Sequence, residues 1–201
     1  YENFPVGRWG VPRARRPDVH AVYAFARAAD DFADEPCYEG RRLEMLDRWS
    51  RNLESCTTSA YEPVFVALGD TIGRLGLPLG PFRDLLSAFR QDAEGRRYGT
   101  WEEVLDYCRR SANPVGRLVL MIMGSAESGL LPLSDSLCTA LQLTNFWQDL
   151  SVDLPRGRCY IPGEDAARFG VDLKALVRGE PQPAAGALLK ELAGRTYRLY
   201  E

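Results

Sequence analysis

The chain has 201 residues, of which 45% are hydrophobic and 26% charged, and its formal net charge is −3. This length and composition predict a globular protein with one domain over residues 1–201, and the lack of a basic surplus argues against binding to nucleic acid. Five widely spaced cysteines without a CxxC pair argue against a disulfide framework. The sequence contains neither an apolar run of membrane-span length nor a signal peptide, so we expect a cytoplasmic protein.

Apolar residues recur at spacings of three and four along most of the chain, and the alternation typical of strands is rare. Prolines and glycines separate the periodic segments. We therefore expect an all-α domain, with Ser134 as the N-cap of its sixth helix. The expected helices cover residues 17–35, 41–55, 63–75, 81–94, 101–129, 134–153, 172–178 and 184–201. The last pattern continues to the end of the sequence, so we expect a fragment from which C-terminal helices are missing.

The stretch ARAADDFADEP, residues 26–36, places four carboxylates at the end of the first expected helix. Residues three and four apart share a helix face, so Asp34 lies beside Asp30 and Asp31, and Glu35 beside Asp31. Pro36 ends the helix, which puts the carboxylates in the last turn, where the helix dipole disfavours negative charge. A solvated acidic helix end would explain one such patch, and a bound cation would explain why the charges gather.

A second stretch, NFWQDLSVDLP, repeats the pattern at residues 145–155. Asp149 and Asp153 share a face one turn before Pro155, and Asn145 lies one further turn back on that face. Two acidic helix ends are harder to explain by solvation, so they predict a functional site. Carboxylate and amide oxygens suit Mg²⁺ or Mn²⁺ rather than zinc. The single histidine, His20, is expected to be a surface or capping residue.

Basic residues near both stretches favour a diphosphate ligand beside the metal. Arg27 stands one turn before Asp30, and Arg156 and Arg158 follow the second stretch in the segment LPRGRCYIP. Guanidinium groups on a mobile loop suit closure over phosphate oxygens, although a local ion pair for Arg27 and a solvated loop are the plain alternatives. The basic N-terminal arm leaves phosphate contact, peripheral membrane contact and plain solvation open; its arginines are Arg8, Arg13, Arg15 and Arg16.

Three segments, in this order, resemble the squalene/phytoene synthase family and, within it, the bacterial hydroxysqualene synthases: VYAFARAADDFADE, YCRRSANPVGRL and LTNFWQDLSVDLPRGRCYIP. The opening ENFP and the SANPVGR and NFWQD motifs point to that branch. The resemblance covers essentially the whole chain. It implies a single-domain isoprenoid-synthase-type helical bundle around a central apolar cavity, with the two aspartate-rich motifs facing each other at its mouth. Further C-terminal helices in the family agree with the expected truncation.

Spacing and resemblance together assign roles to individual residues. The expected metal ligands, whose aspartates are also the expected catalytic groups, are Asp30, Asp31, Asp34, Asn145, Asp149 and Asp153. Tyr107 matches a family tyrosine implicated in proton handling or cation stabilisation. The expected substrate-binding residues are Tyr23, Arg27, Arg110, Asn113, Gln142, Asn145, Gln148, Arg158 and Tyr160. Phe25, Phe146 and Trp147 are candidates to face a carbocation, with a plain core role as the alternative.

Several positions depart from the family pattern. Gln148 and Val152 stand where many two-substrate relatives have an arginine and a glutamate, Arg110 replaces a second tyrosine, and Asn3 replaces a serine. A site without these groups suits one step of a two-step reaction. The resemblance thus implies a lyase of the hopanoid pathway: Mg²⁺-dependent ionisation of presqualene diphosphate, then a water quench that gives hydroxysqualene without NADPH. The alternatives are a head-to-head prenyltransferase that uses farnesyl diphosphate, and a non-catalytic scaffold.

Overall fold

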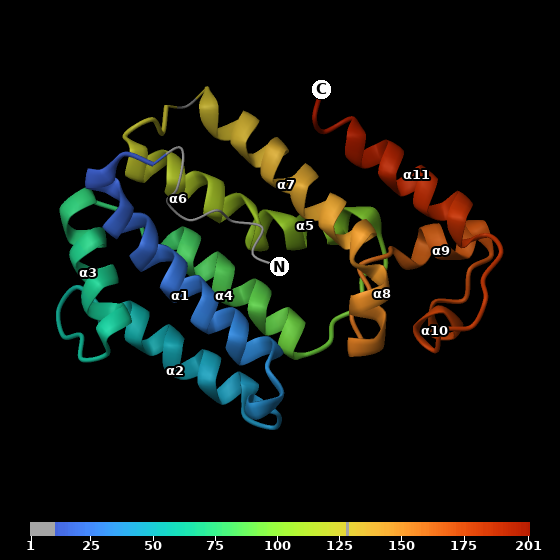
Figure 1. The fold of residues 1–201 in the computed structure, drawn as a ribbon, viewed down its shortest axis with the longest axis horizontal. Coiled ribbons are helices and arrows are strands. Elements are labelled where there is room, and N and C mark those ends of the chain that lie inside the picture. The colour runs from blue at the N-terminus through green and yellow to red at the C-terminus, as the bar shows by residue number, and fades with distance from the viewer. Residues whose placement is uncertain (1–10, 128) are drawn as a thin grey trace.

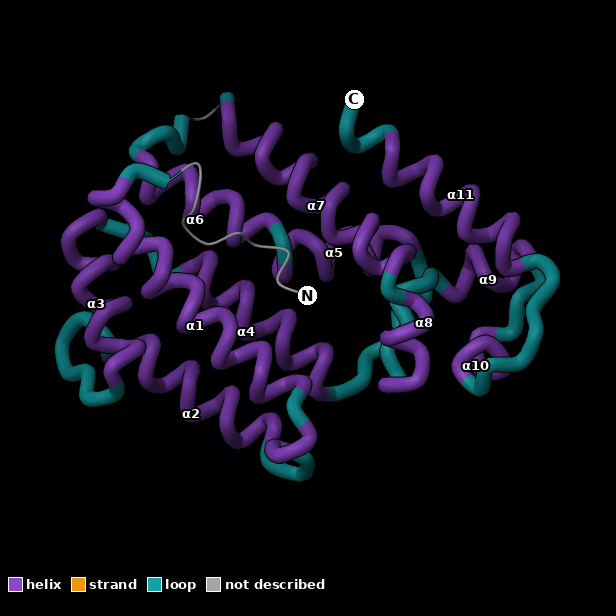
Figure 2. The backbone as a smooth tube through the Cα atoms, viewed as in Figure 1, coloured by secondary structure: helices purple, strands orange, loops and turns teal. Residues whose placement is uncertain are grey.

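The computed structural model describes residues 11–127 and 129–201, and its regular structure there is entirely helical (Figures 1 and 2). The predicted all-α, single-domain class is confirmed. The α-helices are α1 (Arg16–Asp34), α2 (Arg42–Ser55), α3 (Pro63–Leu75), α4 (Gly80–Ala93), α5 (Trp101–Ser111), α6 (Asn113–Met123), α7 (Leu130–Gln148), α8 (Leu150–Asp153), α9 (Gly163–Phe169), α10 (Leu173–Val177) and α11 (Ala185–Tyr197). The predictions on Asn3 and Arg8 lie outside the described residues.

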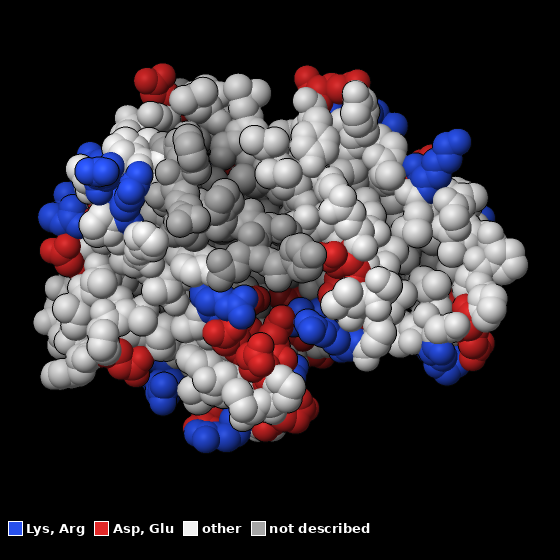
Figure 3. Space-filling view, in the orientation of Figure 1, with Lys and Arg blue, Asp and Glu red and all other residues white. Residues whose placement is uncertain are grey.

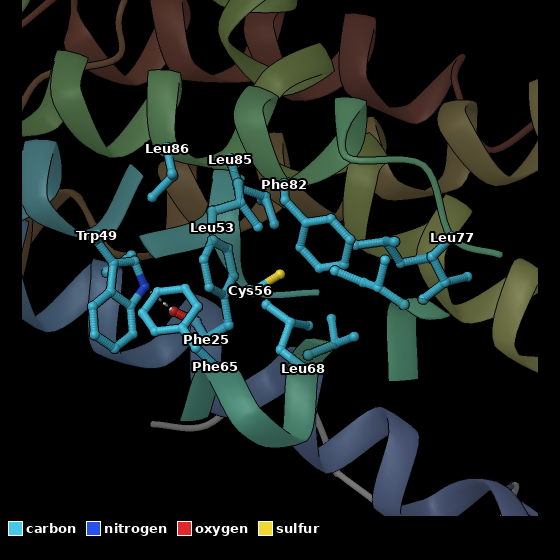
Figure 4. Close-up of a cluster of buried hydrophobic side chains, with 14 of the residues drawn as sticks. Phe25, Trp49, Leu53, Cys56, Phe65, Leu68, Leu77, Phe82, Leu85 and Leu86 are labelled. Carbon is cyan, nitrogen blue, oxygen red and sulfur yellow. Dashed lines mark hydrogen bonds between the residues drawn. The ribbon is translucent and has the colours of Figure 1, made fainter. Parts of the chain in front are cut away.

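Helix α1 occupies the middle of one half of the bundle, where it packs against α2, α3, α4 and α6 (Figure 1). Its apolar stripe puts Phe25 at the centre of an aromatic cluster, with ring centroids 6.1 Å from Trp49, 6.0 Å from Phe65 and 5.5 Å from Phe82 (Figure 4). The Trp49 indole nitrogen donates to the Phe25 carbonyl at 3.2 Å. Phe25 therefore belongs to the core and fixes α1, which carries the first acidic stretch.

The other half of the bundle is built around α7, which contacts α5, α6 and α11. The short helix α9 packs against α11, and α10 lies beyond α9 at the same end of the molecule in Figure 1. The predictions had no helix over α9, which follows Pro162 and ends at Gly170 with φ +67°. That left-handed conformation is one that glycine adopts without steric cost, and it marks the end of a helix only seven residues long.

The single helix expected over residues 101–129 is wrong, because two helices occupy this stretch. Helix α5 ends at Ser111 and α6 begins at Asn113, with Pro114 in its first turn. Proline has no N–H to donate to the preceding turn and restricts the residue before it, so α5 cannot continue through this point. Helix α6 then ends at Gly124, whose φ of +72° is left-handed. After the break between α5 and α6, α6 packs against α7.

Ser134 is not an N-cap, because α7 begins one turn earlier, at Leu130. Pro132 lies in the first turn of α7, where its missing N–H costs no helical hydrogen bond. The helix expected to reach residue 153 is also interrupted: α7 ends at Gln148, and α8 resumes at Leu150. The break is slight, since the Asp149 N–H still donates to the Asn145 carbonyl at 2.8 Å and the Asp153 N–H to the Asp149 carbonyl at 2.9 Å.

All five cysteines are free, as the absence of a CxxC pair predicted. Within the described ranges, no helix combines the length and the apolar character needed to cross a membrane.

Two glycines one turn apart in α3 provide a test of the packing between α2 and α3. A Cβ at Gly69 would lie 2.1 Å from the Cys56 carbonyl oxygen, whereas one at Gly73 would have nothing within 4 Å. Gly69→Ala should lower the free energy of unfolding by about 2 kcal/mol or more, because backbone must move. Gly73→Ala should raise it by about 0.5–1 kcal/mol through helix propensity. Chemical denaturation measures both, and equal effects would contradict this packing.

Candidate active site

A cavity of about 630 Å³ opens between α1, α4, α5 and α7, with α8 and the segment after it at its mouth. Its polar lining includes Arg27, Asp30, Asn145, Asp149, Asp153 and Arg158. Its interior is lined by Phe89, Tyr107, Val115, Leu141, Phe146 and Tyr160, among others. Figure 3 shows acidic side chains gathered near the end of α1, with basic side chains on either side. The two acidic stretches, more than 100 residues apart, thus meet at one opening.

The last turns of α1 divide their carboxylates between the cavity and two arginines. Asp30 lines the cavity. The Arg27 guanidinium forms ion pairs with the Asp30 carboxylate at 3.5 Å and with the Asp31 carboxylate at 2.8 Å. Asp34 turns toward Arg158, whose Nη1 donates to its Oδ2 at 2.8 Å, while Nη2 meets the other oxygen. The cationic compensation that the helix end requires therefore comes partly from these arginines. Arg27 is an ion-pair partner and also a residue of the cavity wall.

On the opposite side, the predicted face of α7 and α8 is preserved through the helix break. Asn145, Asp149 and Asp153 all line the cavity. Burial raises the pKa of Asp153 above its ordinary value, and the neighbouring Asp149 carboxylate raises it further. Burial also raises the pKa of Asp30, although Arg27 and Arg158 oppose that shift. These carboxylates are thus incompletely compensated by the protein alone, as a cation-binding site requires.

Asp92, on α4, is a residue of the cavity that the sequence analysis missed. Its carboxylate accepts a hydrogen bond from the Tyr107 hydroxyl at 2.7 Å and one from the Tyr160 hydroxyl at 2.9 Å. Burial raises the pKa of Asp92 to about 7, against the pull of these two hydrogen bonds. Burial also raises the pKa of both tyrosines, which keeps them protonated as donors. A signal existed in the sequence, because Asp92 continues the apolar stripe that includes Phe89.

Aromatic rings surround this hydrogen-bonded group. The Phe146 and Tyr160 rings stack with centroids 3.7 Å apart and planes 6° apart, and Tyr107 lies 5.3 Å from Tyr160. Phe146 therefore lines the cavity, as its position in the second stretch suggested. Trp147 points elsewhere, because its indole nitrogen donates to Thr196 of α11 at 2.9 Å. The cavity thus has an aromatic wall whose polar tips are directed at one carboxylate.

Three predicted substrate-binding residues lie away from the cavity lining in the described part of the chain. Arg110 forms an ion pair with Asp106 at 3.0 Å, one helical turn away. Asn113 is buried and accepts a hydrogen bond from Thr139 at 2.9 Å, so it ties α6 to α7. Gln148 is exposed at the end of α7. By contrast, the polar residues Tyr23 and Gln142 do line the cavity.

A second, smaller cavity of about 160 Å³ adjoins the first and shares Tyr23, Ala26 and Val115 with it. The rest of its lining is aliphatic: Val19, Val22, Leu85, Val119 and Ile122. The combined space therefore runs from a charged mouth into a hydrocarbon-lined interior. Such a space suits a ligand with an anionic head and a long apolar tail.

The residues at the mouth fit a hard divalent cation held jointly with a ligand. Their donor atoms are carboxylate and amide oxygens, which suit Mg²⁺. In the described ranges, no cluster of three His, Cys, Asp or Glu side chains could enclose an ion. Water and phosphate oxygens would have to complete the coordination, as is usual for Mg²⁺.

The sequence profile of the squalene/phytoene synthase family matches residues 1–201, and the chain belongs to this family. A phytoene synthase from Arthrospira platensis is 34% identical over 99% of this chain and 69% of its own length. A hydroxysqualene synthase from Rhodopseudomonas palustris is 36% identical over 98% of this chain and 68% of its own. The chain thus spans about two thirds of the length of these relatives. The resemblance inferred from the three motifs is confirmed.

Solved structures agree with the fold. The squalene synthase HpnC from Alicyclobacillus acidocaldarius matches with a TM-score of 0.89 and 40% identity, over 99% of this chain and 75% of its own. A dehydrosqualene synthase in complex with a ligand matches with a TM-score of 0.81 and 30% identity, over 94% of this chain and 66% of its own. The isoprenoid-synthase-type bundle is therefore confirmed, and the family's members are enzymes that act on prenyl diphosphates.

The environment of Asp92 predicts a pH dependence of stability. Its folded-state pKa of about 7 lies above the ordinary 3.8, so the folded protein keeps a proton that the unfolded chain releases. The contribution of Asp92 to stability therefore falls as pH rises through this interval. Asp92→Asn should remove that decline, whereas Glu94→Gln, which removes an exposed carboxylate just beyond α4, should keep it. Urea denaturation over a pH series measures the slope, and a variant that retains the wild-type slope contradicts the assignment.

Proposed function

We propose that this protein catalyses the Mg²⁺-dependent ionisation of presqualene diphosphate and the addition of water to the resulting cation, giving hydroxysqualene and diphosphate. The observation that carries the proposal is the polarity of the cavity, which changes from carboxylates and arginines at the mouth to aromatic and aliphatic walls inside. Ionisation of an allylic or cyclopropylcarbinyl diphosphate needs both environments, because a diphosphate polyanion and a carbocation form together. The proposal extends the family assignment to one reaction.

The mouth supplies charge for the departure of diphosphate. When bound, Mg²⁺ would neutralise charge on the phosphate oxygens as the carbon–oxygen bond breaks. Asp30, Asp149 and Asp153 would hold it from the two sides of the opening. Arg27 lines the same space and can donate to phosphate oxygens from the α1 side. The expected loss from removing one such electrostatic partner is about 10²–10³-fold in rate.

The interior supplies surfaces that tolerate a carbocation. The stacked Phe146 and Tyr160 rings present aromatic faces, each of which stabilises a nearby cation by about 0.5–2 kcal/mol. The adjoining aliphatic cavity accommodates hydrocarbon. Gln142 and Asn145 are polar groups inside the lining that can hold one water near the cation. The position of that water then determines which carbon receives the hydroxyl group.

Proton transfer completes the reaction. When the water oxygen bonds to the carbocation, it must release one proton. The Tyr107 hydroxyl donates to Asp92 Oδ2 at 2.7 Å, so Tyr107 can accept that proton while passing its own to the carboxylate. A pKa near 7 makes Asp92 a suitable acceptor at neutral pH. Atoms and charge balance: substrate and water become alcohol, diphosphate and one proton held by the protein.

The relatives of this chain include enzymes named for each of the two candidate reactions. The hydroxysqualene synthase of Sinorhizobium fredii, 36% identical over 96% of this chain and 66% of its own, favours the proposal. The phytoene synthase of Arthrospira platensis favours a second candidate, head-to-head condensation of two prenyl diphosphates. Gln148 and Val152 bear on that choice less than the sequence implied, because both are exposed and lie outside the cavity lining in the described residues.

Neutralising one cavity carboxylate should separate catalysis from stability. Asp149→Asn should reduce turnover by about 10²–10³-fold, because it removes a charge that the metal requires. Without Mg²⁺ the melting temperature should stay equal or rise, since the like charge of Asp153 loses a neighbour. Glu35→Gln, in the same acidic mouth but exposed and outside the cavity lining in the described residues, is the control and should keep turnover. Turnover that persists in Asp149→Asn, or falls only as the protein unfolds, contradicts the metal role.

The identity of the terminating nucleophile can be read from isotope incorporation. The purified protein is incubated with presqualene diphosphate and Mg²⁺ in ¹⁸O-water, with and without NADPH, and products are identified by mass spectrometry. We expect labelled hydroxysqualene in equal yield under both conditions, because water is the nucleophile. Squalene formed only with NADPH, or no consumption of presqualene diphosphate, would falsify the proposed reaction. Formation of presqualene diphosphate or phytoene from prenyl diphosphates would favour the condensing alternative.

A further inference from the structure

Asp34 and Arg158 form an ion pair across the mouth of the cavity. Their positions are 124 residues apart in sequence, and the Arg158 Nη1 atom donates to Asp34 Oδ2 at 2.8 Å. The Nη2 atom meets the second carboxylate oxygen, so the contact is two-pronged. The side chains are only 22% and 20% exposed, respectively, which separates this pair from the solvated ion pairs elsewhere on the surface.

Arg158 is the principal compensation for the Asp34 charge. Among the described residues, no other cationic side chain forms an ion pair with this carboxylate, and the Arg42 guanidinium reaches only the main-chain oxygen of Asp34, at 3.4 Å. Arg27 is engaged with Asp30 and Asp31 one turn earlier. A second cation that approached Asp34 would therefore have to share the carboxylate with Arg158 or displace Arg158 from it.

Arg158 is also placed to act on the other side of the mouth. Arg158 lines the cavity together with Asp149 and Asp153. The backbone N–H of Arg158 donates a hydrogen bond to the backbone carbonyl of Asp153 at 3.0 Å. Gly157, just before it, has φ +79°, a conformation open to glycine without strain. The backbone of Arg158 is thus tied to the second acidic stretch, while its guanidinium is tied to the first.

We propose that Arg158 is an exchangeable counter-ion, which neutralises Asp34 in the metal-free protein and transfers from this carboxylate to phosphate when Mg²⁺ and a diphosphate bind together. The inference rests on the proposed function. A carboxylate and a phosphate are both good bidentate partners for a guanidinium, so the exchange replaces one charge-assisted contact with another. Asp34 is then free to face the metal. Mg²⁺ and diphosphate should consequently strengthen each other's binding. Diphosphate draws Arg158 away from Asp34, which frees the carboxylate for Mg²⁺, and Mg²⁺ on Asp34 frees Arg158 for phosphate.

The exchange predicts effects of opposite sign from one substitution. In Arg158→Gln, Mg²⁺ alone should bind about tenfold more tightly than in the wild type, because its competitor for Asp34 is gone. Inorganic diphosphate in the presence of Mg²⁺ should bind about tenfold more weakly, because a phosphate partner is gone. Arg51→Gln is the control, because it removes the same charge from an exposed position on α2, outside the cavity lining in the described residues. Calorimetric titration measures both affinities in all three proteins.

A second substitution approaches the pair from the other side. Asp34→Asn frees the guanidinium, so inorganic diphosphate titrated in the presence of EDTA should bind about fivefold more tightly than in the wild type, and Mg²⁺ alone more weakly. Glu35→Gln removes a neighbouring exposed carboxylate and controls for net charge. This variant keeps Arg158, so it tests the exchange even if Arg158→Gln fails to fold.

The outcomes separate the exchange from the function beneath it. If the wild type binds no diphosphate with Mg²⁺, the proposed function fails and the exchange with it. If the wild type binds but Arg158→Gln leaves the affinity for Mg²⁺ alone unchanged or weaker, the exchange is overturned while the function stands. Equal changes in Arg51→Gln, or metal-free diphosphate binding in Asp34→Asn no tighter than in Glu35→Gln, also overturn it. Opposite shifts confined to Arg158 and Asp34 support it.

Discussion

The negative charge at the end of α1 has to be compensated, because it lies in the last turn of a helix and at the mouth of a largely apolar cavity. Neither setting stabilises a carboxylate. Arg27 compensates locally, and Arg158 does so from a loop that follows α8. The second contact joins the two halves of the bundle at the point where substrate would enter, so electrostatic compensation and assembly of the site are one requirement.

That compensation works only because the helices behind it are held in place. Phe25 is buried among the rings of Trp49, Phe65 and Phe82, and this cluster sets the direction of α1 within the first half of the bundle. In the second half, Asn113 and Thr139 join α6 to α7. Close packing of this kind resists small displacements, so the carboxylates on α1 and those that follow α7 keep their relative positions. The positions of the polar groups at the mouth thus depend on the packing of the apolar core behind them.

Inside the cavity, the proposed proton transfer depends on one carboxylate that lies among aromatic side chains. Asp92 accepts hydrogen bonds from two tyrosines on different segments, and its raised pKa follows from burial. An acid with this pKa can take up and release a proton near neutrality, whereas the carboxylates at the mouth are proposed to hold a cation. One residue type would therefore perform two tasks, because α4 places Asp92 among aromatic rings and α1 and α8 present the others at an opening.

The sequence by itself determined the all-α class, the two acidic helix ends and the family, because periodicity and short-range spacing are local properties. Asp30, Asn145, Asp149 and Asp153 follow from helical spacing and share one cavity in the structure. The sequence did not determine the break before Pro114, because a helix-breaking proline there interrupts a continuing apolar periodicity. It also did not determine which charged or polar group each side chain contacts. Arg110 pairs with Asp106, and Asp92 meets Tyr107 and Tyr160. Only the tertiary structure decided these contacts, because they depend on how separate helices pack and which groups become buried together.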